Sequence, residues 1–483
     1  MQLPISIRKI NDLQEAGSLL FICRDAAILK DFGLDKPLID HISKNLDGGD
    51  MAITFRYPHT IGARILRTGT SSLPEMEKLR NDGALFCKKL QEEQQRRFCV
   101  LDLTNTPEAL MAFLDGVISA SYRFDKYKSK KEKLSLIVDK INVVSPSIDQ
   151  SQLDELSSVW AATWAARDLV NETPAELTAE KLSACALQVG AQTGFKTKIY
   201  SKEQIEAMNL GGLLAVNRGS MDPPTFTFME WKPIHAHNSQ PIVLVGKGVV
   251  YDTGGLNLKT MPGSLDDMKC DMAGAAAVIG TMAAVALNKL PVHVVGLIPA
   301  TDNRPGFNAY APGDVLTMHN GTTVEVMDTD AEGRLILADA LSYANQLAPR
   351  LVIDLATLTG NAVMAIGPYG SVAMGTANEQ IRTLLNLSAD QSGERLAWFP
   401  FWDEYDESLK SDVADMKNIG GREAGAITAG KFLSRFTNYP WVHLDIAGTA
   451  FLNKPIGYRG TGGTGVGVRL LYTFLKNGLP NNQ

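Results

Sequence analysis

The chain has 483 residues, with 47 lysines and arginines against 53 aspartates and glutamates, so its formal net charge is −6. Apolar residues make up 45% of the chain and charged residues 21%, which is typical of a globular enzyme. This composition excludes a disordered chain, a collagen-like repeat and a disulfide scaffold. The length predicts two or three domains with a large buried core.

The cysteines and the hydropathy of the chain indicate the cellular compartment of the protein. The five cysteines show no C-x-x-C spacing and predict a reducing environment; they are Cys23, Cys87, Cys99, Cys185 and Cys270. The first residues lack the apolar run of a signal peptide. The longest apolar stretch, residues 272–287, is rich in alanine and glycine and predicts a buried core helix. We therefore expect a cytoplasmic protein.

Residues 1–150 predict an N-terminal α/β domain. Residues 98–103 and 134–138 are typical of strands, and Thr106 followed by Pro107 predicts the start of a helix. The basic run at 126–133 predicts a solvent-exposed turn. Contact with DNA is the alternative for this run, although the acidic net charge argues against it.

Residues 151–170 predict a helix that connects this domain to a C-terminal domain over residues 171–483. Beyond residue 175, apolar runs alternate with glycine-rich turns or helices; they lie at 241–245, 292–298, 323–327 and 351–355. Because these runs are apolar throughout, they predict strands buried on both faces. We therefore expect an α/β fold with a doubly wound, mostly parallel sheet and a ligand site at the carboxyl ends of its strands.

Carboxylates gather in three segments where the chain changes direction, at 245–259, 268–277 and 326–337. Asp252, Asp271, Asp330 and Glu332 would converge if these segments lie side by side. Four carboxylates in one cleft repel each other unless cations neutralise them. The pattern therefore predicts a paired site for divalent ions such as Zn²⁺, Mn²⁺ or Mg²⁺.

Each of these residues also has a simpler interpretation when taken alone. Asp271 could cap a helix, and Asp330 and Glu332 could form an acidic first turn. Lys247, which follows a strand, would by itself be a surface lysine.

Other catalytic and nucleotide-binding motifs are excluded. The chain has no H-E-x-x-H and no G-x-S-x-G, which argues against a single-zinc protease of that type and against a Ser-His-Asp hydrolase. Residues 460–465 match G-x-G-x-x-G, but no βαβ unit could follow them, so we interpret them as a flexible or packing loop.

The residues at 328–335, Asp-Thr-Asp-Ala-Glu-Gly-Arg-Leu, resemble the signature of the cytosolic leucyl aminopeptidase family. The resemblance covers most of 171–475, including 356–360 and 443–448, and is much weaker over 1–150. Three departures stand out. Asp328 replaces an asparagine, Tyr251-Asp252-Thr253 replaces Phe-Asp-Ser, and the stretch between Lys259 and Asp271 is one residue longer.

The resemblance implies a binuclear metal centre. Lys247, Asp252, Asp271 and Glu332 would hold the tighter ion, and Asp252, Asp330 and Glu332 the exchangeable one. The ions would be Zn²⁺ or Mn²⁺. Lys247 could act as a ligand only as the neutral amine.

The resemblance also implies catalytic roles for Lys259 and Arg334, with a bicarbonate ion held by Arg334 as general base. It implies a homohexamer and a pocket for the first side chain of the substrate. That pocket would be lined by Met268, Thr357, Gly360 and Ala447.

The function predicted from these observations is that of a metal-dependent aminopeptidase. It would hydrolyse N-terminal leucyl or other apolar residues from peptides through a water activated by two metals. A two-metal phosphoesterase is the enzymatic alternative, and substrates with a free amine or a phosphate would distinguish the two. DNA binding by the N-terminal domain is the other alternative, and salt-dependent retention on DNA would test it.

Overall fold

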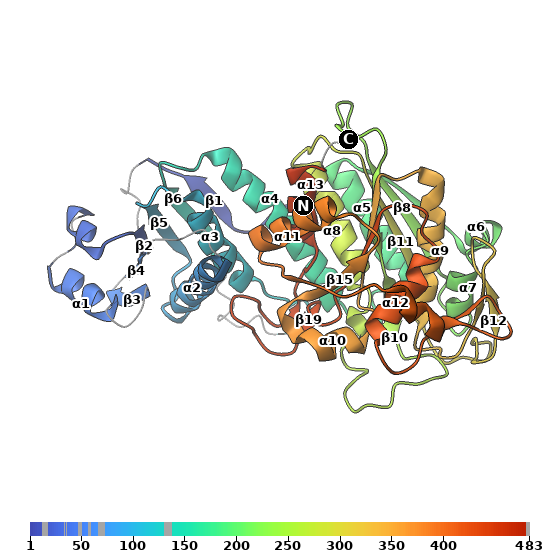
Figure 1. Cartoon of the computed structure of the whole chain (residues 1–483). Coiled ribbons are helices and arrows are strands. Elements are labelled where there is room, and N and C mark those ends of the chain that lie inside the picture. The colour runs from blue at the N-terminus through green and yellow to red at the C-terminus, as the bar shows by residue number, and fades with distance from the viewer. Residues whose placement is uncertain are drawn as a thin grey trace. The chain divides into compact units, whose positions relative to one another are not determined.

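A computed structural model describes residues 1–11, 18–32, 34, 36–46, 51–56, 59–65, 73–129 and 138–479 (Figure 1). The chain forms two compact units. The N-terminal unit comprises Gln2–Ala161 and Lys454–Thr461, and the C-terminal unit comprises Met1, Ala162–Asn453 and Gly462–Gln483. None of the helices in the described part of the chain has the length and hydropathy that a membrane span needs.

The N-terminal unit is built on a six-stranded sheet with the order β1-β6-β5-β2-β4-β3. All neighbouring strands are parallel except β3 and β4. The strands are β1 (Ser6–Lys9), β2 (Ser18–Cys23), β3 (Met51–Arg56), β4 (His59–Ile65), β5 (Arg97–Asp102) and β6 (Lys140–Val144). The helices are η1 (Ala26–Phe32), α1 (Lys36–Leu46), α2 (Leu73–Glu92) and α3 (Pro107–Ser121).

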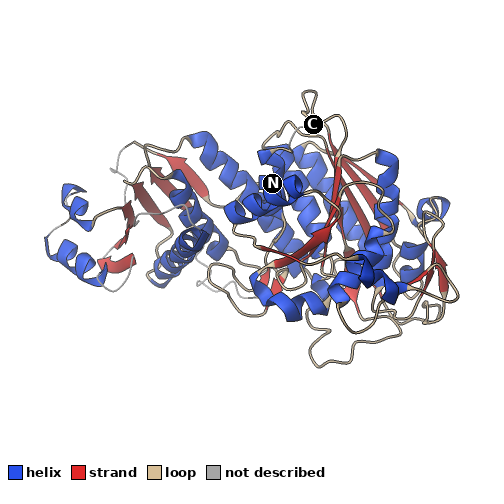
Figure 2. Ribbon diagram, in the orientation of Figure 1, coloured by secondary structure: helices blue, strands red, loops and turns tan. Residues whose placement is uncertain are grey.

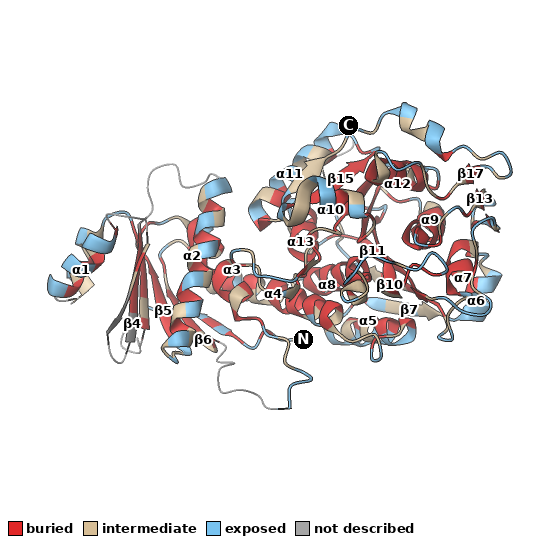
Figure 3. Ribbon diagram, turned by 90° about the horizontal axis from the view of Figure 1, so that it is seen from below, coloured by how far each residue is buried: buried red, intermediate tan, exposed pale blue. Residues whose placement is uncertain are grey.

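Apolar side chains along β2 point alternately to the two faces of the sheet, which explains why helices cover both faces. Phe21 belongs to a buried cluster with Leu29 of η1 and Ile42 of α1. Its neighbour Leu20 points to the opposite face, where it lies close to Gly62 and to Phe86 of α2. Figure 3 shows α1 on one side of the sheet and α2 and α3 on the other.

The predicted elements of this unit are confirmed where the structure describes them. The strand at 98–103 is β5, and α3 begins at Pro107 with Thr106 as its N-cap residue. Residues 126–129 form an exposed turn, as expected for the first half of the basic run. The rest of that run, and residues 134–137 of the predicted strand, lie outside the described residues.

The predicted connecting helix is α4 (Gln150–Asn171), which runs from the N-terminal unit into the C-terminal unit. The N-terminal unit also includes Lys454–Thr461, from far along the chain. Within this unit, Tyr458 is buried and its backbone N–H donates to the Asn81 Oδ1 at 3.0 Å. The predicted domain boundaries at residues 150 and 170 stay a prediction that limited proteolysis would test.

The C-terminal unit contains a nine-stranded sheet with the order β16-β15-β18-β14-β9-β11-β8-β7, in which β10 also pairs with β11. The central strands β18, β14, β9 and β11 are parallel, whereas β15, β8 and β7 join antiparallel neighbours. The strands are β7 (Lys196–Tyr200), β8 (Thr225–Trp231), β9 (Ile242–Gly246), β10 (Gly248–Asp252), β11 (Val294–Asn303), β14 (Leu351–Ala356), β15 (Ser371–Gly375), β16 (Leu396–Trp398) and β18 (Trp441–Asp445).

Helices cover both faces of this sheet, as a doubly wound fold requires (Figures 2 and 3). One layer contains α5 (Ala179–Thr193), α8 (Ala273–Leu287), α11 (Glu379–Ser392) and α13 (Val468–Asn477). The other contains α7 (Gly211–Asn217), α9 (Glu332–Ala344) and α12 (Gly425–Ser434). The short helices α6 (Lys202–Ala207) and α10 (Gly360–Ile366) complete the unit. The helix predicted at 272–287 is α8, and nearly all of its residues are buried.

One predicted strand lies elsewhere. The run at 323–327 was expected in the parallel sheet, but β13 (Thr323–Glu325) belongs to a small sheet with β12 (Val315–Thr317) and β17 (Met416–Lys417). The reason is its polarity, since Val324 is buried whereas Thr323 and Glu325 are only half-buried. A strand with polar residues on alternate positions does not suit a sheet covered on both faces.

The loop at 460–465 has a packing role. A side chain at Gly462 would lie 2.3 Å from Asn171 Oδ1, and one at Gly465 would lie 2.7 Å from the Thr163 methyl. Both glycines have positive φ, at 79° and 72°. These glycines therefore allow the loop to lie directly on α4, which confirms the packing interpretation.

Candidate active site

A cavity of about 650 Å³ lies at the carboxyl ends of the parallel strands of the C-terminal unit. Lys247 follows β9, Asp252 ends β10, and residues 357–360 follow β14. Every residue that the sequence suggested for the site lines this cavity. They are Lys247, Asp252, Lys259, Met268, Asp271, Asp330, Glu332, Arg334, Thr357, Gly360 and Ala447.

Three buried carboxylates form the centre of the cavity. Asp252, Asp271 and Glu332 each offer one oxygen, and these oxygens lie within 4.8 Å of one another. The N-cap residue of α8 is Met272, so the interpretation of Asp271 as a helix cap is wrong. Glu332 is the first residue of α9, but its carboxylate is buried among charged groups rather than exposed to solvent.

Lys247 is buried beneath this cluster, so its interpretation as a surface lysine is wrong. Its Nζ lies 2.7 Å from Asp271 Oδ1 and 2.9 Å from Glu332 Oε1, and it donates to the Thr357 carbonyl at 2.9 Å. Burial acts to lower the pKa of Lys247, but the surrounding carboxylates outweigh it and raise that pKa. Gly333 leaves room for the amine, since a Cβ there would lie 2.7 Å from Nζ.

Lys259 contacts two other carboxylates of the cavity. Its Nζ lies 2.7 Å from Asp252 Oδ2 and 2.5 Å from Asp330 Oδ1. Burial opposes the charged form of Lys259, yet the carboxylates raise its pKa as well. Burial, with the charges of Asp252 and Glu332, raises the pKa of Asp330 to about 7.

Arg334 lies in the first turn of α9 and also lines the cavity. Its Nη1 donates to the Asn418 carbonyl at 2.8 Å, whereas its buried Nε has no hydrogen-bond partner among the described residues. Burial lowers the pKa of Arg334 to about 10, so the guanidinium stays charged at neutral pH. It therefore offers a donor and a positive charge to an anion in the cavity.

Asn303 is a site residue that the sequence analysis missed. It ends β11, and its Nδ2 donates to Asp252 Oδ1 at 2.9 Å and to the Thr329 carbonyl at 3.0 Å. The backbone N–H of Gly254 donates to the same Asp252 oxygen at 2.8 Å. A polar residue at the carboxyl end of an apolar strand was the signal that could have identified Asn303.

Asp445 organises the loop at 357–360, where the sequence analysis expects the substrate pocket. Its carboxylate accepts hydrogen bonds from the Thr359 hydroxyl at 2.7 Å and from the Leu358 backbone N–H at 3.2 Å. Thr357 also donates its hydroxyl to Asp271 Oδ1 at 2.7 Å. This loop is thus tied directly to the carboxylate cluster.

Two further residues lie near the carboxylate cluster. Asp328 also lines the cavity, and its Oδ1 accepts the Asp330 backbone N–H at 2.8 Å, which fixes the acidic turn. Cys270 is buried beside Asp271, and burial raises the pKa of its thiol to about 12. A protonated thiol is a poor ligand for a metal ion.

The donor set fits divalent cations. Asp271 Oδ2 is buried with no hydrogen-bond partner among the described residues, although buried carboxylate oxygens normally have one. Carboxylate oxygens are the ligands that Zn²⁺ and Mn²⁺ accept. A pair of such ions would also neutralise the four carboxylates more fully than the two lysines do.

Comparisons with known proteins agree with this geometry. The profile of the cytosol aminopeptidase family, catalytic domain, matches residues 164–472. A probable cytosol aminopeptidase of Chlorobium limicola is 40% identical over 474 residues, which are 93% of each chain. A mutant of tomato leucine aminopeptidase is 28% identical with a TM-score of 0.84, and the match covers 98% of this chain and 96% of that one. The bottromycin maturation enzyme BotP, in complex with Mn, is 28% identical with a TM-score of 0.82, covering 96% and 99%.

Proposed function

The chain belongs to the cytosol aminopeptidase family, and on this premise we propose how its cavity carries out the reaction. The protein is a leucyl aminopeptidase, a metal-dependent hydrolase that removes N-terminal residues from peptides. The observation that carries our proposal is the convergence of Asp252, Asp271 and Glu332 between two lysines. A phosphoesterase, the enzymatic alternative, has no support from the relatives.

Two divalent ions would be held by the residues of this cluster. Lys247, Asp252, Asp271 and Glu332 would hold one, and Asp252, Asp330 and Glu332 the other. Lys247 would bind as the neutral amine, because the ions would offset the carboxylate charges that otherwise raise its pKa. When bound, such ions supply a nucleophilic water at neutral pH and polarise the peptide carbonyl. We propose Zn²⁺ or Mn²⁺, and the complex of BotP with Mn supports the second.

Lys259 would stabilise the negative charge that develops on the carbonyl oxygen. It is the more exposed of the two lysines, and its ammonium lies between Asp252 and Asp330 at the wall of the cavity. A positive charge fixed in place before the reaction needs no reorganisation when the oxyanion forms.

Arg334 would hold a bicarbonate ion as general base. Its unpaired Nε supports this role, since a buried guanidinium N–H without a partner favours an anionic acceptor. The first side chain of the substrate would lie among Met268, Thr357, Gly360 and Ala447, whose apolar surface suits leucine.

The wider setting is also a proposal. The names of the relatives refer to the cytosol, and we propose the same compartment for this protein. We also propose that it assembles as a homohexamer and acts on peptides with a free N-terminus. Sedimentation analysis would test the assembly.

A comparison of blocked and free substrates tests the proposed function. A free N-terminal amine offers a lone pair to a divalent ion, whereas acetylation delocalises that lone pair and adds bulk. With Mn²⁺ in excess, N-acetyl-leucyl-p-nitroanilide should show kcat/KM lower by a factor on the order of 10³ or more than leucyl-p-nitroanilide. Similar turnover of both substrates would rule out an aminopeptidase.

A further inference from the structure

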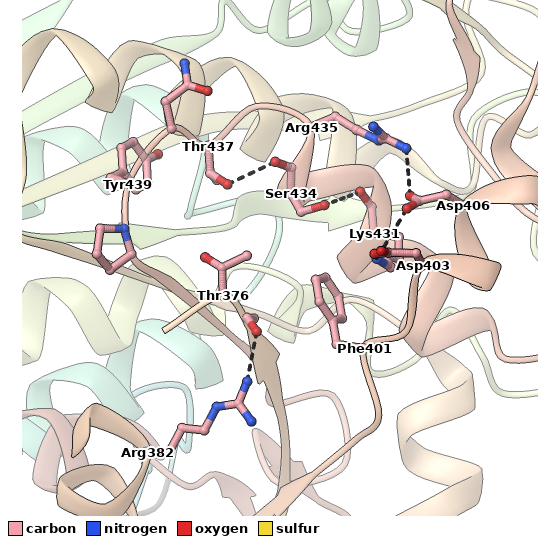
Figure 4. Close-up of a pocket in the computed structure, with 13 residues that line it drawn as sticks. Thr376, Arg382, Phe401, Asp403, Asp406, Lys431, Ser434, Arg435, Thr437 and Tyr439 are labelled. Carbon is pink, nitrogen blue, oxygen red and sulfur yellow. Dashed lines mark hydrogen bonds and ion pairs between the residues drawn. The ribbon is translucent and has the colours of Figure 1, made fainter. Parts of the chain in front are cut away.

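A second cavity, of about 800 Å³, lies in the C-terminal unit and shares no lining residue with the catalytic cavity (Figure 4). Thr376 follows β15 and Pro440 precedes β18, so the cavity lies at the end of β18 opposite to Asp445. Helix α12 separates the two cavities. Thr428 near its start lines the catalytic cavity, and Lys431 near its end lines the second one.

The lysine in this second cavity is almost completely buried. The Lys431 side chain is 5% exposed, and its Nζ lies 3.1 Å from Asp403 Oδ1 and 3.2 Å from Asp406 Oδ2. The ammonium also lies 4.6 Å from the centre of the Phe401 ring. A buried ammonium requires anionic partners because it has lost its hydration.

One of these two partners is held weakly. The Asp403 side chain is fully exposed, so it is as well solvated by water as by Lys431. Ion pairs that involve an exposed carboxylate contribute little to stability. A different anion could therefore take the place of Asp403 at the Lys431 ammonium, while Asp403 turns into solvent.

The opposite wall of the cavity offers a second cation. Arg382 donates from Nε to the Ala377 carbonyl at 3.1 Å and from Nη2 to the Gly375 carbonyl at 3.2 Å. Both partners are neutral, and no carboxylate among the described residues forms an ion pair with Arg382. The guanidinium carbon also lies 5.2 Å from the centre of the Trp398 ring, so within the described part of the chain Arg382 contacts only neutral groups, and Nη1 makes no hydrogen bond there.

The charges around the cavity therefore favour an anion. The cations are Lys431, Arg382 and Arg435, and the carboxylates are Asp403 and Asp406. Arg435 and Asp406 pair with each other at 3.1 Å. Displacement of Asp403 would leave one carboxylate, Asp406, among these three cations.

We propose that this cavity binds a small anion that carries carboxylate or phosphate groups. The anion replaces Asp403 at Lys431 and pairs with the guanidinium of Arg382. The site is separate from the peptide-hydrolysing cavity, and its existence does not depend on the roles proposed there.

Calorimetric titration of the full-length, metal-loaded protein tests the proposal. Inorganic phosphate and succinate are the two probes, at constant ionic strength set by chloride, and succinamide is the neutral control. We expect one of the two anions to bind and succinamide not to bind. Lys431→Gln and Arg382→Gln should each weaken binding about tenfold or more, because each removes a charge-assisted hydrogen bond.

Lys410→Gln is the matched control, since it removes an exposed lysine paired with Glu407 outside the cavity. It should leave binding unchanged. Hydrolysis of leucyl-p-nitroanilide by each variant reports that the chain is folded, because no residue changed here lines the catalytic cavity. If Lys431→Gln fails to fold, Arg382→Gln and Asp403→Asn still test the proposal.

Asp403→Asn distinguishes an anion site from a purely structural ion pair. Because it removes the competing carboxylate, it should tighten anion binding several-fold, whereas a purely structural ion pair predicts no gain. Failure of both anions to bind the wild-type protein would overturn the proposal. Binding that Arg382→Gln leaves intact, or that Asp403→Asn does not strengthen, would also overturn it.

Discussion

Lys247 and Lys259 contact the same carboxylate cluster, but their surroundings differ. Lys247 is 3% exposed and contacts Asp271 and Glu332, whereas Lys259 is 16% exposed and contacts Asp252 and Asp330. Only the second faces the open part of the cavity. At the scale of single residues, this difference supports the proposal that Lys247 would hold metal and Lys259 would act on substrate.

The two lysines should therefore respond differently to removal. Lys247→Ala should lose bound metal and activity together, because it leaves Asp271 and Glu332 without their buried partner. Lys259→Ala should retain both ions and lose kcat by at least about tenfold, which is about 1.4 kcal/mol of barrier. Metal analysis with steady-state kinetics measures both effects, and equal loss of metal in the two variants would contradict these roles.

Gly333→Ala should disturb the cluster although it replaces no charged residue. A Cβ at this position would lie 2.5 Å from Lys247 Cε. Alanine favours helices over glycine by about 1 kcal/mol, so helix propensity alone predicts a gain in stability. We expect weaker metal binding and at least about tenfold lower kcat/KM, where tenfold corresponds to about 1.4 kcal/mol.

Gly360→Ala is the matched control for this variant. This substitution also adds a methyl group near the start of a helix that lines the cavity. No neighbouring atom lies within 4 Å of the position that the new Cβ would take. It should retain the metal content of the wild-type protein. Unchanged metal affinity in Gly333→Ala would show that Lys247 has more room than the structure indicates.

At the scale of elements, the buried Asp339 connects three parts of the C-terminal unit. It lies on α9, and its carboxylate accepts the backbone N–H of Leu213 in α7 at 2.9 Å. It also accepts the N–H of His319, just beyond β12, at 3.0 Å. The same helix carries Glu332 and Arg334 at its start, so this anchor helps to fix the position of these two candidate site residues.

Asp339→Ala should therefore lower stability substantially. Each buried N–H left without an acceptor costs about 1–3 kcal/mol, so two of them predict a loss of about 2–6 kcal/mol. Glu407→Ala, which removes an exposed carboxylate paired with Lys410, should change stability by less than about 1 kcal/mol. Chemical denaturation of both variants measures the difference, and similar values would contradict the anchoring role.

Sequence patterns predicted the central strands better than the edges of the sheet. The runs that became β9, β11 and β14 are apolar on both faces, which is a strong local signal. The antiparallel strands β7 and β8 carry polar residues and were not predicted, because their place depends on pairing with distant residues. The prediction for β13 was wrong for the same reason, since a short run does not specify which sheet it joins.

The candidate site was predicted more completely than the fold around it. Its charged residues lie within three short segments, and parallel strands bring the ends of such segments together. What the sequence did not reveal was the environment of each group. That Lys247 is buried beneath the cluster, and that Asn303 and Asp445 support it, follows from contacts over long distances in the chain.

At the scale of the whole molecule, the charge of the cluster bears on the effect of metal removal. Lys247 and Lys259 each bridge two carboxylates, so the chain itself balances part of the negative charge. Treatment with EDTA should abolish activity but leave the far-ultraviolet circular dichroism unchanged. The Tm should fall, because an ion that binds only the folded state stabilises it.

Addition of Mn²⁺ or Zn²⁺ should restore both activity and Tm. In Lys259→Ala, EDTA should lower the Tm further than in the wild-type protein, since Asp252 and Asp330 then lack their counter-ion. Unfolding of the wild-type protein on chelation would show that the lysines do not balance the cluster.

The membership of Lys454–Thr461 in the N-terminal unit has a consequence for synthesis of the protein. Tyr458 and its partner Asn81 can meet only after the intervening chain has left the ribosome. At about 5–20 residues per second, translation of residues 162–453 takes roughly 15–60 s. During that interval the first unit lacks its last segment, so it completes its fold only when nearly the whole chain has been made.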